Sequence, residues 1–347
     1  MIEESGVAEE IADHRPVRPH VVLLGAGASR AALPTGDRSG TPIPLLAEVA
    51  AQLDLRTHFP RDLQGLADSD FEAAYSQLFD RDRAAVEPID SRVRIFFQEL
   101  EIPDEATIYD ALLLSLRPKD AIFTFNWDPF LLQANLRLMR AGVRDLPRLH
   151  FLHGCVAVGY CPDHNVMMTL SQRCRECASP PVATRLLFPV EHKDYQGDGF
   201  VKDEWDFLRG ILRETLFFTI FGYSAPATDV EAIDLLKDGW GPVEERQFEQ
   251  TEIINRAGAD EDELRATWDP FIHTHHYEIH GSFFDSWLAN HPRRSIEAFH
   301  RQYIEAQFIE NNPIPTGLGS LTDLISWFQP LLDAEASADS DDSAKEP

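Results

Sequence analysis

The chain lacks the features that would place it in a membrane or direct it out of the cell. None of its apolar runs approaches the roughly 20 residues that a membrane-spanning helix needs. Its first residues, Met1-Ile2-Glu3-Glu4, have neither the positive charge nor the apolar segment of a secretion signal. We therefore expect a cytoplasmic protein that does not bind a membrane.

Basic residues are scarce. Lysine and arginine total 31 against 58 aspartate and glutamate residues, so the formal net charge is −27. A surface of that charge repels phosphate backbones. We expect no direct binding of nucleic acid by this chain.

Cysteine is absent outside one short segment, and all four cysteines lie between Cys155 and Cys177. In a reducing compartment, clustered cysteines indicate a metal site before they indicate disulfides. Two pairs have the short spacing of a zinc knuckle, Cys161 with His164 and Cys174 with Cys177. We predict that these four residues bind a structural Zn²⁺. Cys155 is the alternative fourth ligand in place of His164.

The most informative stretch is an apolar run that leads directly into a glycine-rich turn. Residues 21–24, Val-Val-Leu-Leu, show no polar alternation, which is typical of a strand buried on both faces of a parallel sheet. The turn Gly25-Ala26-Gly27-Ala28-Ser29 follows, and its glycines allow a tight bend and the close approach of a phosphate. Arg30 occupies the place of the third glycine in a dinucleotide fingerprint. The alternative is a strand-to-helix turn without a ligand.

Four further apolar stretches, at residues 120–125, 148–154, 216–224 and 251–255, alternate with helical patterns. This alternation predicts an α/β fold with a doubly wound parallel sheet. In such a sheet ligands bind outside the carboxyl ends of the strands. The polar residues and glycines at those ends should therefore meet beside the glycine-rich turn; they are Asn126, Asp128, His153, Gly222, Ser224 and Asn255.

Composition and periodicity divide the rest of the chain. The acidic termini, residues 1–18 and 334–347, are expected to be disordered. The main domain covers residues 19–256, with a helical insertion at about 45–116 and a zinc module at about 155–180. Residues 257–333 are predicted to form a mainly helical C-terminal extension.

Two basic clusters in the extension have no assigned chemistry. His273, His275, His276 and His280 are close in sequence, but no carboxylate or thiol lies at a matching spacing, so we expect a polar surface or strand end. Arg293 and Arg294 are expected to begin a solvent-exposed helix or to contact an acidic neighbour.

Taken together, these stretches resemble the sirtuin-like superfamily. Its motifs are a Gly-Ala-Gly-x-Ser turn, a Thr-x-Asn-x-Asp strand end, a His-Gly pair, a Gly-x-Ser strand end and a late strand that ends in Asn. All five occur here in that order over residues 20–256. The resemblance implies a Rossmann-type domain that binds NAD⁺ as its substrate and cleaves the nicotinamide–ribose bond, with a zinc module after the His-Gly pair.

The resemblance also implies roles for the residues of this sequence. His153 would be the base, Asn126 would hold the ribose or the attacking water, and Asp128 would orient a neighbouring group. His150 would point away from that face, because strand residues three apart lie on opposite faces. The cofactor-binding set would be Gly25, Ala26, Gly27, Ser29, Thr124, Asn126, Asp128, Gly222, Ser224 and Asn255. Within it, Ser29 and the amides of residues 25–28 would meet the pyrophosphate, and Ser224 and Asn255 would lie on the adenosine side.

Two departures from deacylating sirtuins favour hydrolysis of NAD⁺ to nicotinamide and ADP-ribose. Phe125 stands where deacylases usually have Gln, and Leu187-Phe188-Pro189-Val190-Glu191 lacks the glycine of their Phe-Gly-Glu stretch. The sequence thus resembles bacterial sirtuin-like NAD⁺ hydrolases of anti-phage defence. The alternatives are a protein deacylase and a non-catalytic sensor of NAD⁺ or ADP-ribose. Because an unregulated NAD⁺ hydrolase would be toxic, we expect a homo-oligomer or a regulatory protein partner.

Overall fold

The structure is a computed structural model that describes residues 4–5, 18–188, 198–225, 229–246, 248–268, 277–317 and 319–343. Most of the predicted N-terminal arm and three histidines of the cluster, His273, His275 and His276, lie outside these residues. Glu4–Ser5 of the arm form a short strand, β1, which pairs in parallel with β11 (Phe308–Ile309). Among the described residues no helix has the length and apolarity to cross a membrane.

The centre of the molecule is a parallel sheet of six strands, in the spatial order β10-β9-β8-β2-β3-β4. Their bounds are β2 His20–Leu24, β3 Ala121–Thr124, β4 Arg148–Phe151, β8 Phe217–Phe221, β9 Gln250–Ile254 and β10 Tyr277–His280. Taken along the chain, this is the 3-2-1-4-5-6 order of the Rossmann fold. The predicted fold class is confirmed, and the order reverses between β2 and β8.

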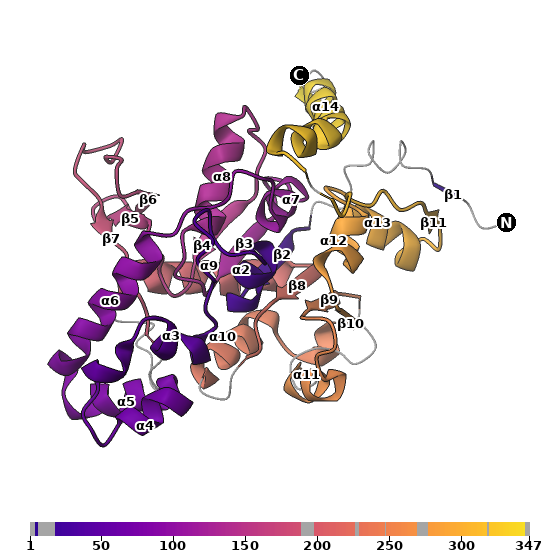
Figure 1. Ribbon diagram of the computed structural model, residues 1–347. Coiled ribbons are helices and arrows are strands. Elements are labelled where there is room, and N and C mark those ends of the chain that lie inside the picture. The colour runs from indigo at the N-terminus through magenta and orange to yellow at the C-terminus, as the bar shows by residue number, and fades with distance from the viewer. Residues whose placement is uncertain are drawn as a thin grey trace.

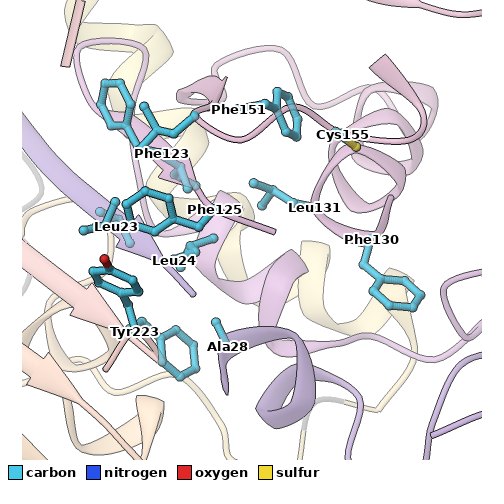
Figure 2. Packing of buried hydrophobic residues seen from close by; sticks show 14 of the residues in the cluster. Leu23, Leu24, Ala28, Phe123, Phe125, Phe130, Leu131, Phe151, Cys155 and Tyr223 are labelled. Atoms are coloured by element: carbon cyan, nitrogen blue, oxygen red, sulfur yellow. The ribbon is translucent and has the colours of Figure 1, made fainter. Parts of the chain in front are cut away.

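Strand β2 has the burial that is typical of a central strand in a parallel sheet. Every residue of β2 is buried, and β2 pairs with β3 on one side and with β8 on the other. A strand buried on both faces must be covered by two helical layers. Figure 1 shows helices on both sides of the sheet, and Figure 2 shows Leu23 and Leu24 of β2 packed among aromatic side chains such as Phe123 and Phe125.

Helix α8 precedes strand β4 in the chain, and helix α9 packs against β4. Helix α8 (Phe130–Arg140) begins directly after Pro129, and α9 (Gly199–Glu214) is capped by the Asp198 carboxylate, which accepts a hydrogen bond from the Val201 amide. His150 of β4 stacks on Phe207 of α9 with ring centres 4.5 Å apart. Helix α9 also packs against α10 (Val230–Trp240).

The predicted helical insertion is present between β2 and β3. It contains α3 (Leu46–Gln52), α4 (Gln64–Ser69), α5 (Phe71–Arg81), α6 (Glu87–Gln98) and α7 (Ile108–Leu114), with the 3₁₀ turns Leu55–His58 and Arg83–Val86. Helix α2 (Ala26–Ala32) lies against α7, and α7 against α8. Thus α7 belongs to the layer that covers the sheet, whereas α3 to α6 extend beyond it (Figure 1).

The zinc module is a small antiparallel sheet after β4. Strand β5 (Val158–Cys161) lies between β6 (Val166–Thr169) and β7 (Val182–Ala183). The turn from β5 to β6 carries His164, and the loop from β6 to β7 carries Cys174 and Cys177.

The C-terminal part differs from its prediction in two ways. Residues 257–333 include, besides helix α11 (Glu261–Trp268), the edge strand β10, so the main sheet does not end at residue 256. Short helices α12 (Trp287–Asn290) and α13 (Ser295–Phe299), a 3₁₀ turn at Phe283–Asp285 and a π-helical turn at His300–Ile304 follow β10. Strand β10 reads Tyr-Glu-Ile-His and is only half-buried at the edge of the sheet, so it lacks the continuous apolar run that marks a strand such as β3.

The second difference concerns the C-terminus. Helix α14 spans Leu321–Ser343, so residues 334–343, predicted to be disordered, are helical. The Glu335 carboxylate accepts hydrogen bonds from Arg293 Nε at 2.8 and 2.9 Å and forms an ion pair with Arg294. Both arginines are fully buried and not at the surface of a helix start. The Glu335 carboxylate on α14 offsets part of their charge and is the acidic neighbour that the sequence predicted.

Candidate functional site

The glycine-rich turn lies against the end of β8, at the point where the strand order reverses. The Gly25 amide donates to the Phe221 carbonyl at 2.9 Å, and the Gly27 amide donates to the Gly222 carbonyl at 3.0 Å. A Cβ on Gly222, whose φ is +66°, would lie 2.1 Å from the Ala28 nitrogen. These glycines therefore let two chain segments touch. The Gly25, Gly27 and Ala28 amides, predicted to meet a pyrophosphate, donate instead to protein carbonyls, the Ala28 amide to Gly25 at 2.9 Å.

A cavity of about 950 Å³ opens at these carboxyl ends. It lies at the reversal of strand order, where doubly wound sheets bind ligands. The predicted residues that line it are Ala26, Gly27, Asn126, Asp128, His153, Gly222, Ser224 and Asn255. The sheet therefore brings together residues that are up to 229 positions apart, from Ala26 to Asn255.

Four residues of the predicted set, Gly25, Ala28, Ser29 and Thr124, are not part of the cavity wall. Ser29 and Thr124 are buried, and Gly25 packs against Gly222 and Tyr223. The Thr124 hydroxyl accepts a hydrogen bond from the Asn126 amide nitrogen of the main chain at 3.0 Å, so it shapes the turn after β3. Ser29 hydrogen-bonds to Asn126 and Asp128, two side chains of the cavity wall.

Ser29 lies at the centre of a buried hydrogen-bond network. Its hydroxyl donates to Asp128 Oδ2 at 2.6 Å and accepts from Asn126 Nδ2 at 3.0 Å. The hydroxyl of Tyr109, on α7, lies 2.6 Å from Ser29 Oγ. Asn126 Nδ2 also donates to the Gly25 carbonyl at 2.9 Å. The network joins the glycine-rich turn to the end of β3 and fixes the side chains that the cavity presents.

Asp128 has an unusual electrostatic environment for a carboxylate. Burial raises the pKa of Asp128 from its ordinary value of 3.8 to about 6, although hydrogen bonds from the Ser29 hydroxyl and the Phe130 amide favour its ionised form. Desolvation therefore outweighs the hydrogen bonds. A carboxyl group that titrates near neutral pH in a cavity is a candidate functional group.

His153 enters the cavity beside Phe125. The two ring centres are 4.6 Å apart, and Phe125 also packs on Tyr223 at 4.4 Å. Gly154 follows with a φ of +73°, and a Cβ there would meet the Arg185 carbonyl at 2.1 Å. His150 lies between Phe123 and Phe207 and is not part of the cavity wall. His153 follows the end of β4, and its neighbour Phe125 packs on Trp205 of α9, the helix that also covers His150, so only His153 enters the cavity although strand alternation does not separate the two histidines.

Several residues of the cavity were not found from the sequence. The helical insertion contributes an apolar wall, which includes Ile43, Leu46, Val49, Phe71 and Phe97. Arg30, which is ion-paired with Glu48, and Arg256 also line the cavity, as do Trp127 and Leu187. Periodicity shows only that these apolar residues are buried; it does not show that they face a ligand.

The four predicted zinc ligands converge. The ligand atoms of Cys161, His164, Cys174 and Cys177 all lie within 4.8 Å of one another. Cys161 Sγ is 3.5 Å from His164 Nδ1 and 3.6 Å from Cys177 Sγ, and Cys174 Sγ is 3.6 Å from the same histidine nitrogen. Such separations fit a tetrahedral ion with bonds of about 2.0–2.3 Å. The donor set of three thiolates and one imidazole is that of a closed structural zinc site.

Cys155 is not the fourth ligand. Its side chain is buried and donates to the Asp128 carbonyl at 3.3 Å, and burial raises the pKa of its thiol to about 12. Figure 2 shows it among core side chains such as Phe151. The structure thus decides the question that spacing left open in favour of His164.

Comparison with known proteins gives matches only among solved structures; no family model and no curated protein matches the chain. A Sir2 protein bound to an acetylated peptide is 15% identical, covering 86% of this chain and 96% of the other, with a TM-score of 0.36. A Sir2–p53 peptide–NAD⁺ complex is 16% identical with the same coverage and TM-score. A structure from work on the mechanism and regulation of Sir2 enzymes is 18% identical, covering 74% and 87%, with a TM-score of 0.34.

Proposed function

We propose that the protein hydrolyses NAD⁺ at the nicotinamide–ribose bond and releases nicotinamide and ADP-ribose. The observation that carries the proposal is that Asn126, Asp128 and His153 line one cavity where the order of a Rossmann sheet reverses. The five sirtuin-like motifs of the sequence support NAD⁺ as the ligand. Three of the motifs supply these side chains and the turn that supports them.

The size and the polarity of the cavity agree with a dinucleotide. A volume of about 950 Å³ lies at the upper end of the range of about 300–1,000 Å³ that small-molecule sites occupy. Ser224 and Asn255 lie on the β8 and β9 side, and Asn126 with Asp128 lie on the β3 side. We assign the adenosine to the first side and the nicotinamide riboside to the second.

The orientation of the Asn126 amide defines what it offers to a ligand. The Gly25 carbonyl can only accept a hydrogen bond, so the amide must direct Nδ2 toward it. The Oδ1 atom is then the group that Asn126 can offer to the cavity, as an acceptor for a ribose hydroxyl or a water molecule. A positioned acceptor of this kind suits the attack of water on the ribose.

The chemical step needs few groups. The C1′–N bond breaks and its electron pair stays on nicotinamide, while a water oxygen forms the new bond to C1′ and its proton passes to His153. Such reactions pass through an oxocarbenium-like transition state, which an ionised carboxylate stabilises. Asp128, ionised above its pKa of about 6, supplies the negative charge near the ribose. A zinc ion held by the four ligands of the zinc module, none of which lines the cavity, would stabilise the fold and take no part in this step.

The side of the cavity after the zinc module supports water as the acceptor over an acyl-lysine. The Leu187 amide donates to the His153 carbonyl at 3.0 Å, and Leu187 lines the cavity. Phe188 packs on Trp127 with ring centres 4.9 Å apart, and Trp127 packs on Phe97 at 5.9 Å. An acyl-lysine side chain that entered here would displace these aromatic contacts. Pro189 and residues 190–197 lie outside the described part of the chain.

Mass spectrometry of the products tests the proposal directly. Pure protein is incubated with NAD⁺, with and without an acetylated peptide. Nicotinamide and ADP-ribose without the peptide support hydrolysis. O-Acetyl-ADP-ribose that forms only with the peptide supports the deacylase alternative, and bound but uncleaved NAD⁺ supports a sensor. Depletion of NAD⁺ in infected cells would be the biological role that the resemblance to anti-phage proteins implies, under the control of self-assembly or a partner.

A further inference from the structure

Tyr109 is a buried tyrosine that belongs to none of the motifs. It lies in the first turn of α7, and its side chain is inaccessible to solvent. Its hydroxyl lies 2.6 Å from Ser29 Oγ and 3.3 Å from Asn126 Nδ2. We propose that Tyr109 is a positioning residue that holds Asn126 and Asp128 in their reactive orientation through Ser29. The proposal rests on the proposed NAD⁺ hydrolysis, and Tyr109 itself does not line the cavity.

The number of hydroxyl protons fixes which group donates and which accepts in each hydrogen bond of the network. The Ser29 hydroxyl has one proton, which it donates to the ionised Asp128. Its lone pairs therefore accept, one from Asn126 Nδ2 and one from the Tyr109 hydroxyl. Burial raises the pKa of Tyr109 well above its ordinary value, so the phenol keeps the proton that it donates. The chain of donors runs from Tyr109 to Ser29 to Asp128.

Removal of the phenol oxygen would leave the Ser29 hydroxyl without one donor and less constrained in its rotation. The two Nδ2 hydrogens of Asn126 already point to the Gly25 carbonyl and to Ser29 Oγ, so the substitution would act on the amide through Ser29. Asp128 and Asn126 both bond to the Ser29 hydroxyl, so the orientation of both depends on it. An error of about 1 Å in the position of reacting groups costs about 10²-fold in rate.

The helix that carries Tyr109 is held at both ends. At its start, the Asp110 carboxylate accepts from the Thr107 amide and from Arg137 Nε, both at 2.7 Å. At its end, Arg293 Nη1 donates to the Leu114 carbonyl at 3.1 Å. Contacts at both ends of α7 fix the position of the Tyr109 hydroxyl relative to Ser29. A precise site requires such fixed supporting residues.

The test is the substitution Tyr109→Phe, which removes only the oxygen. We expect kcat for nicotinamide release to fall about 10- to 100-fold while KM for NAD⁺ stays within about threefold, because the lost contacts orient groups and do not touch the ligand. The matched control is Tyr75→Phe. The Tyr75 hydroxyl donates to Asp90 at the same distance of 2.6 Å in the same helical insertion, and it lies outside the cavity wall. Its kcat should stay at the wild-type value.

A double-mutant cycle separates positioning from a general loss of stability. If Tyr109 acts through Ser29, adding Tyr109→Phe to Ser29→Ala should lower kcat by less than threefold beyond Ser29→Ala alone. Independent effects that multiply would overturn the proposal, as would wild-type kcat in Tyr109→Phe. Should Tyr109→Phe fail to fold, Ser29→Ala decides alone: a loss of kcat supports the network, and a rise in KM with unchanged kcat overturns it.

The same protein distinguishes this failure from failure of the proposed function. A wild-type protein that does not cleave NAD⁺ rejects hydrolysis without reference to Tyr109. In that case a crystal structure of Tyr109→Phe decides on positioning: rotated Asn126 or Asp128 side chains support it, and unchanged side chains overturn it.

Discussion

The hydroxyl of Ser29 lies 2.6 Å from the carboxylate of Asp128, although 99 positions separate the two residues in the sequence. The contact joins the glycine-rich turn after β2 to the polar end of β3. It makes Ser29 a support of the site and leaves Asp128 and Asn126 as the side chains that face the cavity.

His153→Ala and Asn126→Ala should each reduce nicotinamide release by about 10²–10⁴-fold, because a base and a positioned acceptor act mainly in the transition state. NAD⁺ affinity, measured by calorimetry, should change far less. His150→Ala is the control, since His150 lies between Phe123 and Phe207, away from the cavity. A greater loss of activity in the control than in His153→Ala would show that the wrong histidine has been assigned.

Asp128→Asn should change how stability depends on pH. The folded-state pKa of Asp128, about 6, lies above its ordinary value of 3.8. The wild type therefore binds its proton more tightly when folded and loses stability as the pH rises from about 4 to about 6, by up to about 3 kcal/mol. Asparagine cannot ionise, so the variant lacks this loss. The free energy of unfolding is measured by urea denaturation at pH 4.5 and 7.5. Relative to the wild type, the variant should be more stable at pH 7.5 than at pH 4.5. The same stability difference between variant and wild type at both pH values contradicts the assignment.

Cys174→Ser should release the metal and lower the melting temperature, because the free energy of binding a structural zinc contributes directly to folding. Cys155→Ala is the control: its sulfur contacts the Asp128 carbonyl and not the ligand cluster, so the zinc content should remain at one ion per chain. Atomic absorption and a thermal melt measure both. Absence of zinc from the purified wild type, with an unchanged melt in Cys174→Ser, would refute the zinc site.

Glu335→Gln should destabilise the fold by about 3–5 kcal/mol, because it removes the carboxylate that pairs with the buried guanidinium groups of both Arg293 and Arg294. Asp333→Asn is the control on the same helix, where an exposed carboxylate accepts from Gln329. Chemical denaturation measures both variants. Similar, small effects would mean that α14 contributes little to the fold.

The sequence by itself determined the fold class and the edge of the sheet at which the candidate site lies. Residues 21–24 are apolar without alternation, so they had to form a strand covered on both faces, and the polar residues that follow each strand had to meet at one edge of a parallel sheet. The spacing of Cys161 with His164 and of Cys174 with Cys177 likewise determined a metal site. These are local patterns, and local patterns suffice where chemistry and secondary structure depend on neighbours in the chain.

Only the tertiary structure decided which of those residues line the cavity. Ser29 and Asp128 belong to separate motifs, and no pattern in either shows that one hydrogen-bonds the other. Tyr109 has the periodicity of any buried helix residue, and its hydroxyl gains a role only where α7 crosses behind the glycine-rich turn. The burial of Arg293 likewise depends on a glutamate 42 positions later. Contacts between distant segments depend on packing in three dimensions, which composition and periodicity do not record.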